Sequence, residues 1–222
     1  MKKIISLFLL IVSFLIFSFG CSSKKDISAE QTAQALYNLH IHYNGKESKK
    51  MGLTDDEINN ILERQKLNEI SIINSNFLDA GFPITDEELE NLYKSQQEAL
   101  KKLKAVISIE SESEDEVILK LSTNYIDILT IDNKAALDTI AEADYAANTG
   151  NELSNAEFSK LYIEKLNENL KLTKPSSEML EATFKFTKKK YLIDEKAVDI
   201  WSPENLEAFI QKILNMSVGV DY

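Results

Sequence analysis

The chain has 222 residues, a formal net charge of −11, six glycines and a single cysteine. The acid excess argues against nucleic acid as a partner, because such binding depends on Lys and Arg contacts to phosphate. One cysteine excludes an internal disulfide, and the length suits one domain.

The N-terminus has the pattern of a secretory signal. Two lysines precede an apolar stretch over 4–19. At 16 residues this stretch is shorter than the roughly 20 that a membrane-spanning helix needs, which favours a signal peptide over 1–20. Its removal would leave 23 bases and 36 acids, so the charge of the remaining chain would be 23 − 36 = −13.

The lone cysteine directly follows this segment. Residues 18–21, Ser-Phe-Gly-Cys, resemble the lipobox of bacterial lipoproteins; Gly20 and Cys21 match its most specific positions, while the Ser and Phe depart from the usual residues. We therefore expect lipidation of Cys21, with 21–27 as a short tether. Two or more acyl chains suffice for stable anchoring, which places the protein on the outer face of the cytoplasmic membrane, on the extracellular side. A lipidated thiol could not also be a catalytic nucleophile.

Helix starts are marked by a polar cap, an acid two or three residues later and flanking apolar residues. This pattern occurs at Thr54, Thr85, Ser154 and, with Pro at the first helical position, Ser202. Together with apolar residues at helical spacing, it predicts helices over about 28–43, 54–81, 85–104, 132–147, 154–171 and from 202 to about 216.

Apolar and polar residues alternate in two other regions, as in half-buried strands. Segments 105–110 and 117–123 predict a hairpin around an acidic turn, and 182–187 with part of 191–200 predict a second hairpin. The expected fold is α+β, in the order ααα-ββ-αα-ββ-α, with long amphipathic helices packed on a small antiparallel sheet. We expect one extracytoplasmic domain over 28–216, with a helical part over 28–104 and a mixed part over 105–216.

Several helix faces are expected to contribute to the core. In the predicted helix 132–147 the apolar residues at helical spacing are Leu137, Ile140, Ala141 and Tyr145, and all four are expected to face inward. The aromatic residues expected in the core are Tyr37, Tyr93, Tyr145, Tyr162 and Trp201. If one of them instead lined an open surface, a pocket for a peptide or apolar ligand would follow.

Candidate catalytic and metal-binding groups are few. His40 and His42 are the only histidines, and two positions apart on a helix they point about 200° away from each other. They cannot share a metal there, and His40 is interpreted as a packing residue. Five carboxylates over 110–116 lack the Gly-turn spacing of a calcium loop and are interpreted as a solvated hairpin tip. No cofactor site, metal site or catalytic residue is predicted, and we expect no enzymatic activity.

Two segments and the N-terminus resemble an uncharacterised family of Gram-positive bacterial lipoproteins. The resemblance rests on Ala-Glu-Gln-Thr-Ala at 29–33 with Leu36 and Tyr37, and on Phe-Lys-Phe at 184–186 before Trp201. It covers most of 28–216 and implies no site residues. The sheet with its closing helix also resembles small cystatin-like or nuclear-transport-factor-like domains, which implies binding and not catalysis.

The favoured hypothesis is a membrane-anchored domain that binds a protein, a peptide or a small ligand. The membrane, through Cys21, and a cationic protein or peptide are the expected partners. Two alternatives stay open: a solute-binding lipoprotein associated with a transporter, and a cell-envelope hydrolase that uses paired carboxylates.

Overall fold

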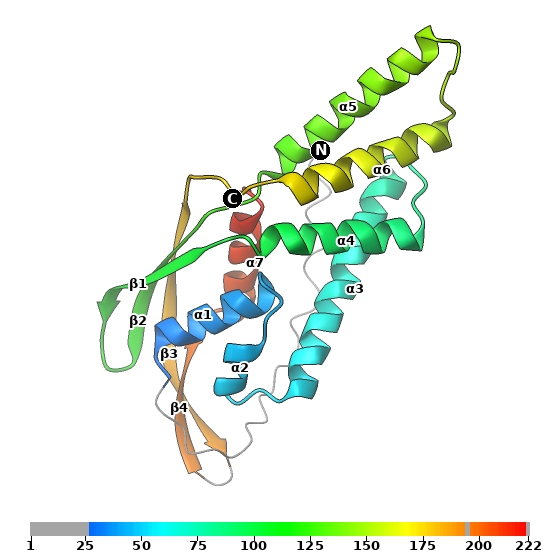
Figure 1. The fold of residues 1–222 in the computed structure, drawn as a ribbon. Helices are drawn as coiled ribbons and strands as arrows, with labels where there is room; N and C mark the ends of the chain where they lie inside the picture. The colour runs from blue at the N-terminus through cyan, green and yellow to red at the C-terminus, as the bar shows by residue number, and fades with distance from the viewer. Residues whose placement is uncertain (1–26, 194–195, 221–222) are drawn as a thin grey trace.

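The computed structural model describes residues 27–193 and 196–220. The predicted signal peptide, Cys21 and all of the tether except Ile27 lie outside these ranges. In chain order (Figure 1) the elements are α1 (Ala29–His40), α2 (Lys46–Lys50), α3 (Asp55–Asp79), α4 (Asp86–Leu100), β1 (Ala105–Glu112), β2 (Glu116–Thr123), α5 (Ile128–Asn148), α6 (Asn155–Leu172), β3 (Leu180–Ile193), β4 (Lys196–Pro203) and α7 (Leu206–Ser217). The α+β class is confirmed, and the predicted order is followed except for the additional short helix α2.

The strands form one antiparallel sheet of order β1-β2-β3-β4 in the described residues. On one face β2 presents Val117, Leu119 and Leu121, all buried, and β3 presents the buried Phe186. Helices α1 and α7 cover this face. The Tyr37 hydroxyl of α1 lies 2.6 Å from the Thr123 hydroxyl at the end of β2. This hydrophobic layer is the centre of the core.

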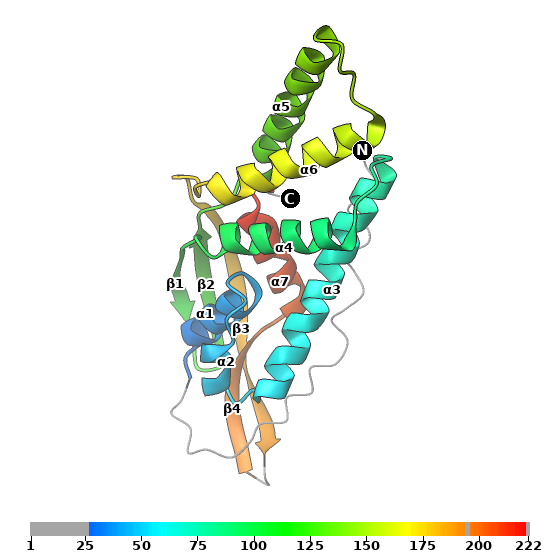
Figure 2. The same ribbon diagram turned by 45° about the vertical axis from the view of Figure 1, so that its right-hand side comes forward.

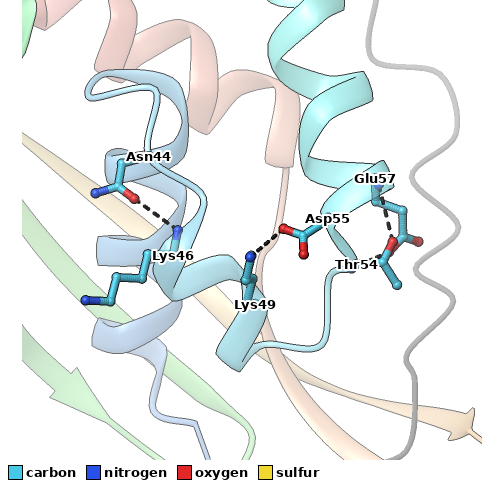
Figure 3. A network of polar contacts seen from close by, with 6 residues as sticks. All are labelled: Asn44, Lys46, Lys49, Thr54, Asp55 and Glu57. Carbon is cyan, nitrogen blue, oxygen red and sulfur yellow. Dashed lines mark hydrogen bonds and ion pairs between the residues drawn. The ribbon is translucent and has the colours of Figure 1, made fainter.

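Three of the four predicted helix caps are confirmed. Thr54, Thr85 and Ser154 each accept a hydrogen bond from the backbone N–H three residues later, and the glutamate there bonds back to the cap. Figure 3 shows the Thr54 cap beside the ion pair between Lys49 of α2 and Asp55 of α3. A further capping box, at Ser28, begins α1. Each box satisfies backbone donors that a helix start leaves without intrahelical partners.

The predicted cap at Ser202 is wrong. Strand β4 continues through Ser202 and Pro203, which pair with Thr187 and Phe186 of β3. Pairing along the long β3 extends the strand past the point where a helix could start. Asn205 is the cap of α7, and its side chain accepts from the N–H of Ala208 at 3.0 Å.

The prediction that Leu137, Ile140, Ala141 and Tyr145 face inward is also wrong. The exposed fractions of Leu137, Ile140 and Tyr145 are 67%, 48% and 71%, and Ala141 is exposed as well. The face of α5 that is buried carries Ile131 together with the smaller Ala135 and Thr139. The helix also begins earlier than predicted, after the cap Asp127. Figures 1 and 2 show the reason: α5 and α6 form a hairpin whose far end extends away from the rest of the fold.

The elements and the core that they share lie within residues 29–217. A chain that begins at Ser22 therefore contains the complete described fold. Within the described ranges, no helix is long and apolar enough to cross a membrane.

Candidate functional site

A cavity of about 400 Å³ lies where α3, α4, α5 and α6 meet. This volume is within the range of small-ligand sites, which are mostly apolar with a few polar groups that fix orientation. The residues that line it are Ile73, Asn76, Phe77, Ala80, Phe82, Leu92, Gln96, Ile128, Leu129, Asp132, Tyr162, Leu166 and Leu170.

Aromatic rings form one wall of the cavity. The Tyr162 ring of α6 lies 5.9 Å from the ring of Phe77 and 5.7 Å from that of Phe82, centroid to centroid. Phe82 reaches this position because α3 ends at Asp79 and the chain turns at Gly81, whose φ of +77° is accessible to glycine at little cost. Pro83 then prevents the helix from continuing. The helix break predicted at this point of the sequence therefore shapes the wall.

A carboxylate and a phenol meet at the α5 side of the cavity. The Tyr162 hydroxyl donates a hydrogen bond to Asp132 Oδ1. Burial raises the pKa of Tyr162, and the hydrogen bond to Asp132 and the charge of that carboxylate raise it further. Tyr162 thus stays protonated and neutral, as a hydrogen-bond donor. Within the described chain, the Asp132 side chain accepts no hydrogen bond other than the one from Tyr162. The amides of Asn76 and Gln96 complete the polar lining.

These groups suit binding more directly than bond cleavage. The carboxylate can accept a hydrogen bond from a ligand donor, and the two amides can donate and accept. The remaining lining is hydrocarbon or aromatic and favours an apolar ligand body. Tyr162 was expected in the core, with a pocket as the alternative. Asn76, Gln96 and Asp132 were not singled out as site residues in the sequence, since nothing in their spacing shows that separate helices bring them together.

His40 belongs to a second polar cluster, between α1 and α3. The His40 Nδ1–H donates to Gln65 Oε1 at 3.0 Å, and Gln65 Nε2 donates to the His40 carbonyl oxygen and to Glu69 Oε1, each at 2.8 Å. Tyr43 also donates to Glu69, at 2.8 Å. Burial lowers the pKa of His40 to about 4 and raises that of Glu69. Because these groups satisfy one another's hydrogen-bonding capacity, we interpret the cluster as a structural contact that holds α1 and α3 together.

The two histidine side chains have separate partners. His42 Nε2 lies 3.1 Å from the Leu103 carbonyl oxygen, while His40 contacts Gln65. Among the described residues, no group of three or more His, Cys, Asp or Glu is placed to hold a metal ion.

The predicted acidic tip lies at the β1–β2 turn, where its carboxylates are exposed. Two of them contact β3: Glu116 pairs with Lys185 at 2.6 Å, and Glu110 accepts from the Thr183 hydroxyl at 3.4 Å. The tip therefore contributes to the polar outer face of the sheet.

The predicted core aromatics have different positions. Tyr37 and Tyr93 are buried, Trp201 is partly buried with the Lys188 ammonium 5.6 Å from its ring centroid, and Tyr162 lines the cavity. Tyr145 is exposed, so its core assignment is wrong.

The comparisons with known proteins concern the fold. No protein-family model and no curated protein matches the sequence. The fold is similar to a crystal structure described as a "putative lipoprotein (ycdA)" from Bacillus subtilis subsp. subtilis str. 168, with a TM-score of 0.60 and 17% sequence identity. The match covers 88% of this chain and 57% of that one, so this chain spans little more than half of its structural neighbour.

Proposed function

We propose that this protein is a lipid-anchored extracytoplasmic lipoprotein that binds a small, largely apolar ligand in the cavity between α3, α4, α5 and α6. In this proposal Cys21 carries the diacylglyceryl group, 1–20 are removed, and the domain is held by the 21–27 tether on the outer face of the cytoplasmic membrane. The lipobox-like residues 18–21 support the anchor, and the likeness to the Bacillus subtilis structure is consistent with it.

The single observation that carries the binding role is the cavity itself. Its hydrocarbon and aromatic walls suit an apolar body, while Asp132 and the amides of Asn76 and Gln96 suit a ligand end that carries a hydrogen-bond donor. An amine or hydroxyl group joined to an apolar chain or ring has this chemistry.

The two alternatives from the sequence have less support. A solute receptor built from two βα lobes would need parallel strands, whereas the described strands form one antiparallel sheet. A carboxylate-based glycosidase needs two carboxyl groups about 5–9.5 Å apart, and among the described residues the cavity has one carboxylate, Asp132. The geometry therefore favours a non-enzymatic binding protein.

The anchor is tested in cells by labelling the full chain with a radioactive or clickable palmitate analogue. Cys21→Ala should abolish the label, and the protein should either leave the membrane fraction or keep its signal peptide. Unchanged labelling of the variant would contradict the anchor.

The cavity is tested with N-phenyl-1-naphthylamine, an apolar fluorophore, and the chain from Ser22. We expect saturable binding at one site per molecule with a blue-shifted emission. Leu166→Trp should fill the cavity and weaken this binding about tenfold or more, which corresponds to 1.4 kcal/mol or more. Leu67→Trp, at an exposed leucine of α3, is the matched control and should bind normally. Equal binding by the two variants would show that the dye binds elsewhere and would refute the cavity as its site.

A further inference from the structure

The outward face of α5 carries a continuous apolar surface. We term four of its residues the α5 stripe: Leu137, Ile140, Ala141 and Tyr145. Counted from Leu137, the other three follow after 3, 4 and 8 residues, so all four lie on one side of the helix. All four are exposed. This is the spacing by which an amphipathic helix normally packs against a neighbour, yet no described element covers it.

The stripe differs from the exposed leucines of α3. Leu67 and Leu78 of α3 are about as exposed as Leu137, at 62% and 61%, but they lie eleven positions apart on a long helix. Isolated exposed apolar residues are ordinary on protein surfaces, whereas contiguous ones mark interaction sites. Residues 137–145 belong to the later part of α5, and Figure 2 shows that end of the helix projecting from the rest of the fold. The exposed stripe is therefore open to a partner.

The surroundings of the stripe are acidic. Helix α5 has four carboxylates and one lysine, and its last turn contains no basic residue. Lys134 is paired with Asp138, and Glu142 is paired with Lys165 of α6. Asp144, which lies between Ile140 and Tyr145 in sequence, makes no ion pair within the described chain. The partial negative charge of the helix C-terminus adds to this field.

We propose that the α5 stripe is the docking surface for a basic amphipathic helix of a partner protein. Leu or similar side chains on the apolar face of that helix would cover Leu137, Ile140 and Tyr145, while its Lys or Arg residues would meet Asp144 and the helix end. Apolar residues at helical spacing on both sides are the contacts that helix-to-helix recognition uses. The partner helix should carry Lys or Arg because these cations complement the carboxylates around the stripe.

The carboxylates around the α5 stripe disfavour two other occupants, a second copy of this chain and a bilayer. A second copy of this chain would bring another set of α5 carboxylates against Asp138 and Asp144. A bilayer with anionic head groups would be repelled in the same way. This surface is separate from the proposed ligand cavity, because none of the stripe residues lines it.

The proposal is tested with the chain from Ser22 and a synthetic 18-residue helix made of Leu and Lys in an amphipathic pattern, labelled with a fluorophore. The control probe has every Lys replaced by Glu and keeps the same apolar face. Fluorescence anisotropy should show saturable binding of the Lys probe that weakens with added salt, and little binding of the Glu probe.

Two surface variants separate the stripe from general attraction between an acidic protein and a basic peptide. Leu137→Asn should weaken binding of the Lys probe about tenfold or more, and Leu67→Asn, at a leucine of similar exposure, should leave it unchanged. Circular dichroism of both variants checks that the fold is kept.

Three results would overturn the proposal. These are equal binding of the Lys and Glu probes, equal binding by Leu137→Asn and Leu67→Asn, and a dimer in analytical ultracentrifugation that Leu137→Asn dissociates. The last result would assign the stripe to a second copy of this chain.

Discussion

The body of the protein, formed by the sheet with α1, α2, α3, α4 and α7, and the arm, formed by the α5–α6 hairpin, both carry apolar residues at regular spacing, but these residues are buried in the body and exposed in the outer part of the arm. In the body, the apolar face of β2 is almost completely buried under helices. In the arm, the larger apolar residues in the outer part of α5 face outward, and smaller residues such as Ala135 and Thr139 make the buried contact. Periodicity thus identifies which residues share a face, but it does not show whether a neighbour covers that face.

The largest expected difference between body and arm is in the cost of removing an aromatic ring. Phe186 is fully buried, and its ring packs edge-on against Phe209 at 5.6 Å. Phe186→Ala should lower the free energy of unfolding by about 3–5 kcal/mol. Tyr145→Ala should change it by less than about 0.5 kcal/mol. Urea unfolding measures both, and comparable losses would mean that Tyr145 is covered in solution.

Acid should weaken the body through His40. Its pKa is about 4 in the folded protein, against an ordinary value of 6.5, so the unfolded chain takes up the proton first as the pH falls. The stability from neutral His40 is complete above pH 6.5 and is lost between pH 6.5 and 4, at a total cost of about 3 kcal/mol. The raised pKa of Glu69 acts in the opposite direction, because its protonation on acidification favours the folded state.

The variant His40→Gln isolates this contribution, since it keeps a donor near Gln65 but has no charge to gain. Its unfolding midpoint should fall less than that of the unchanged protein between pH 7 and 4. His42→Gln, at a less buried histidine whose pKa burial also lowers, should have a smaller effect. Parallel pH profiles for His40→Gln and the unchanged chain would rule out His40 as a source of acid sensitivity.

Two glycines differ in the space around them: Gly45 in the body is tightly packed, whereas Gly150 in the arm faces open space. A methyl group on Gly45 would overlap the Ile58 side chain, so Gly45→Ala should cost about 1–3 kcal/mol. At Gly150, after α5, a methyl group meets nothing within 4 Å, but φ is +82°. Gly150→Ala should therefore cost only about 1 kcal/mol, from backbone conformation alone. A larger loss at Gly150 would indicate that the end of the arm is packed. Thermal or urea unfolding distinguishes the two.

The smallest expected difference concerns helix caps. Thr85→Ala in the body and Ser154→Ala in the arm each remove a capping box, worth about 1 kcal/mol. If the arm opens separately from the body, Ser154→Ala should speed hydrogen exchange of the first-turn amides of α6 about fivefold and shift the global midpoint less than Thr85→Ala does. Equal midpoint shifts would show that arm and body unfold together.

The sequence predicted best what depends on neighbouring residues. The caps at Thr54, Thr85 and Ser154 are local hydrogen-bond patterns, and the strands over 105–123 alternate clearly, so their elements were placed correctly. Ser202 was misassigned because its environment is decided by pairing with Thr187, fifteen positions away, which the local pattern does not contain.

The candidate site was much less predictable. Tyr162 was expected in the core, and the boundary between the predicted helices 54–81 and 85–104 marked the break that places Phe82, but the cavity exists only because separate helices meet around it. Asp132, for example, was expected merely at a helix start. The polar partner that gives it a role, Tyr162, lies thirty positions later on α6.

The register of the central strands also has a consequence for the order of folding. Thr123 ends β2 and pairs with Leu180 at the start of β3, so the chain leaves the sheet and returns to an adjacent strand after 56 residues, 124–179. Closing so long a loop in an unstructured chain is slow. Helices α5 and α6 form from local contacts and bring these two ends together. We therefore expect the hairpin to assemble before β2 and β3 join, and the two halves of the sheet to meet last.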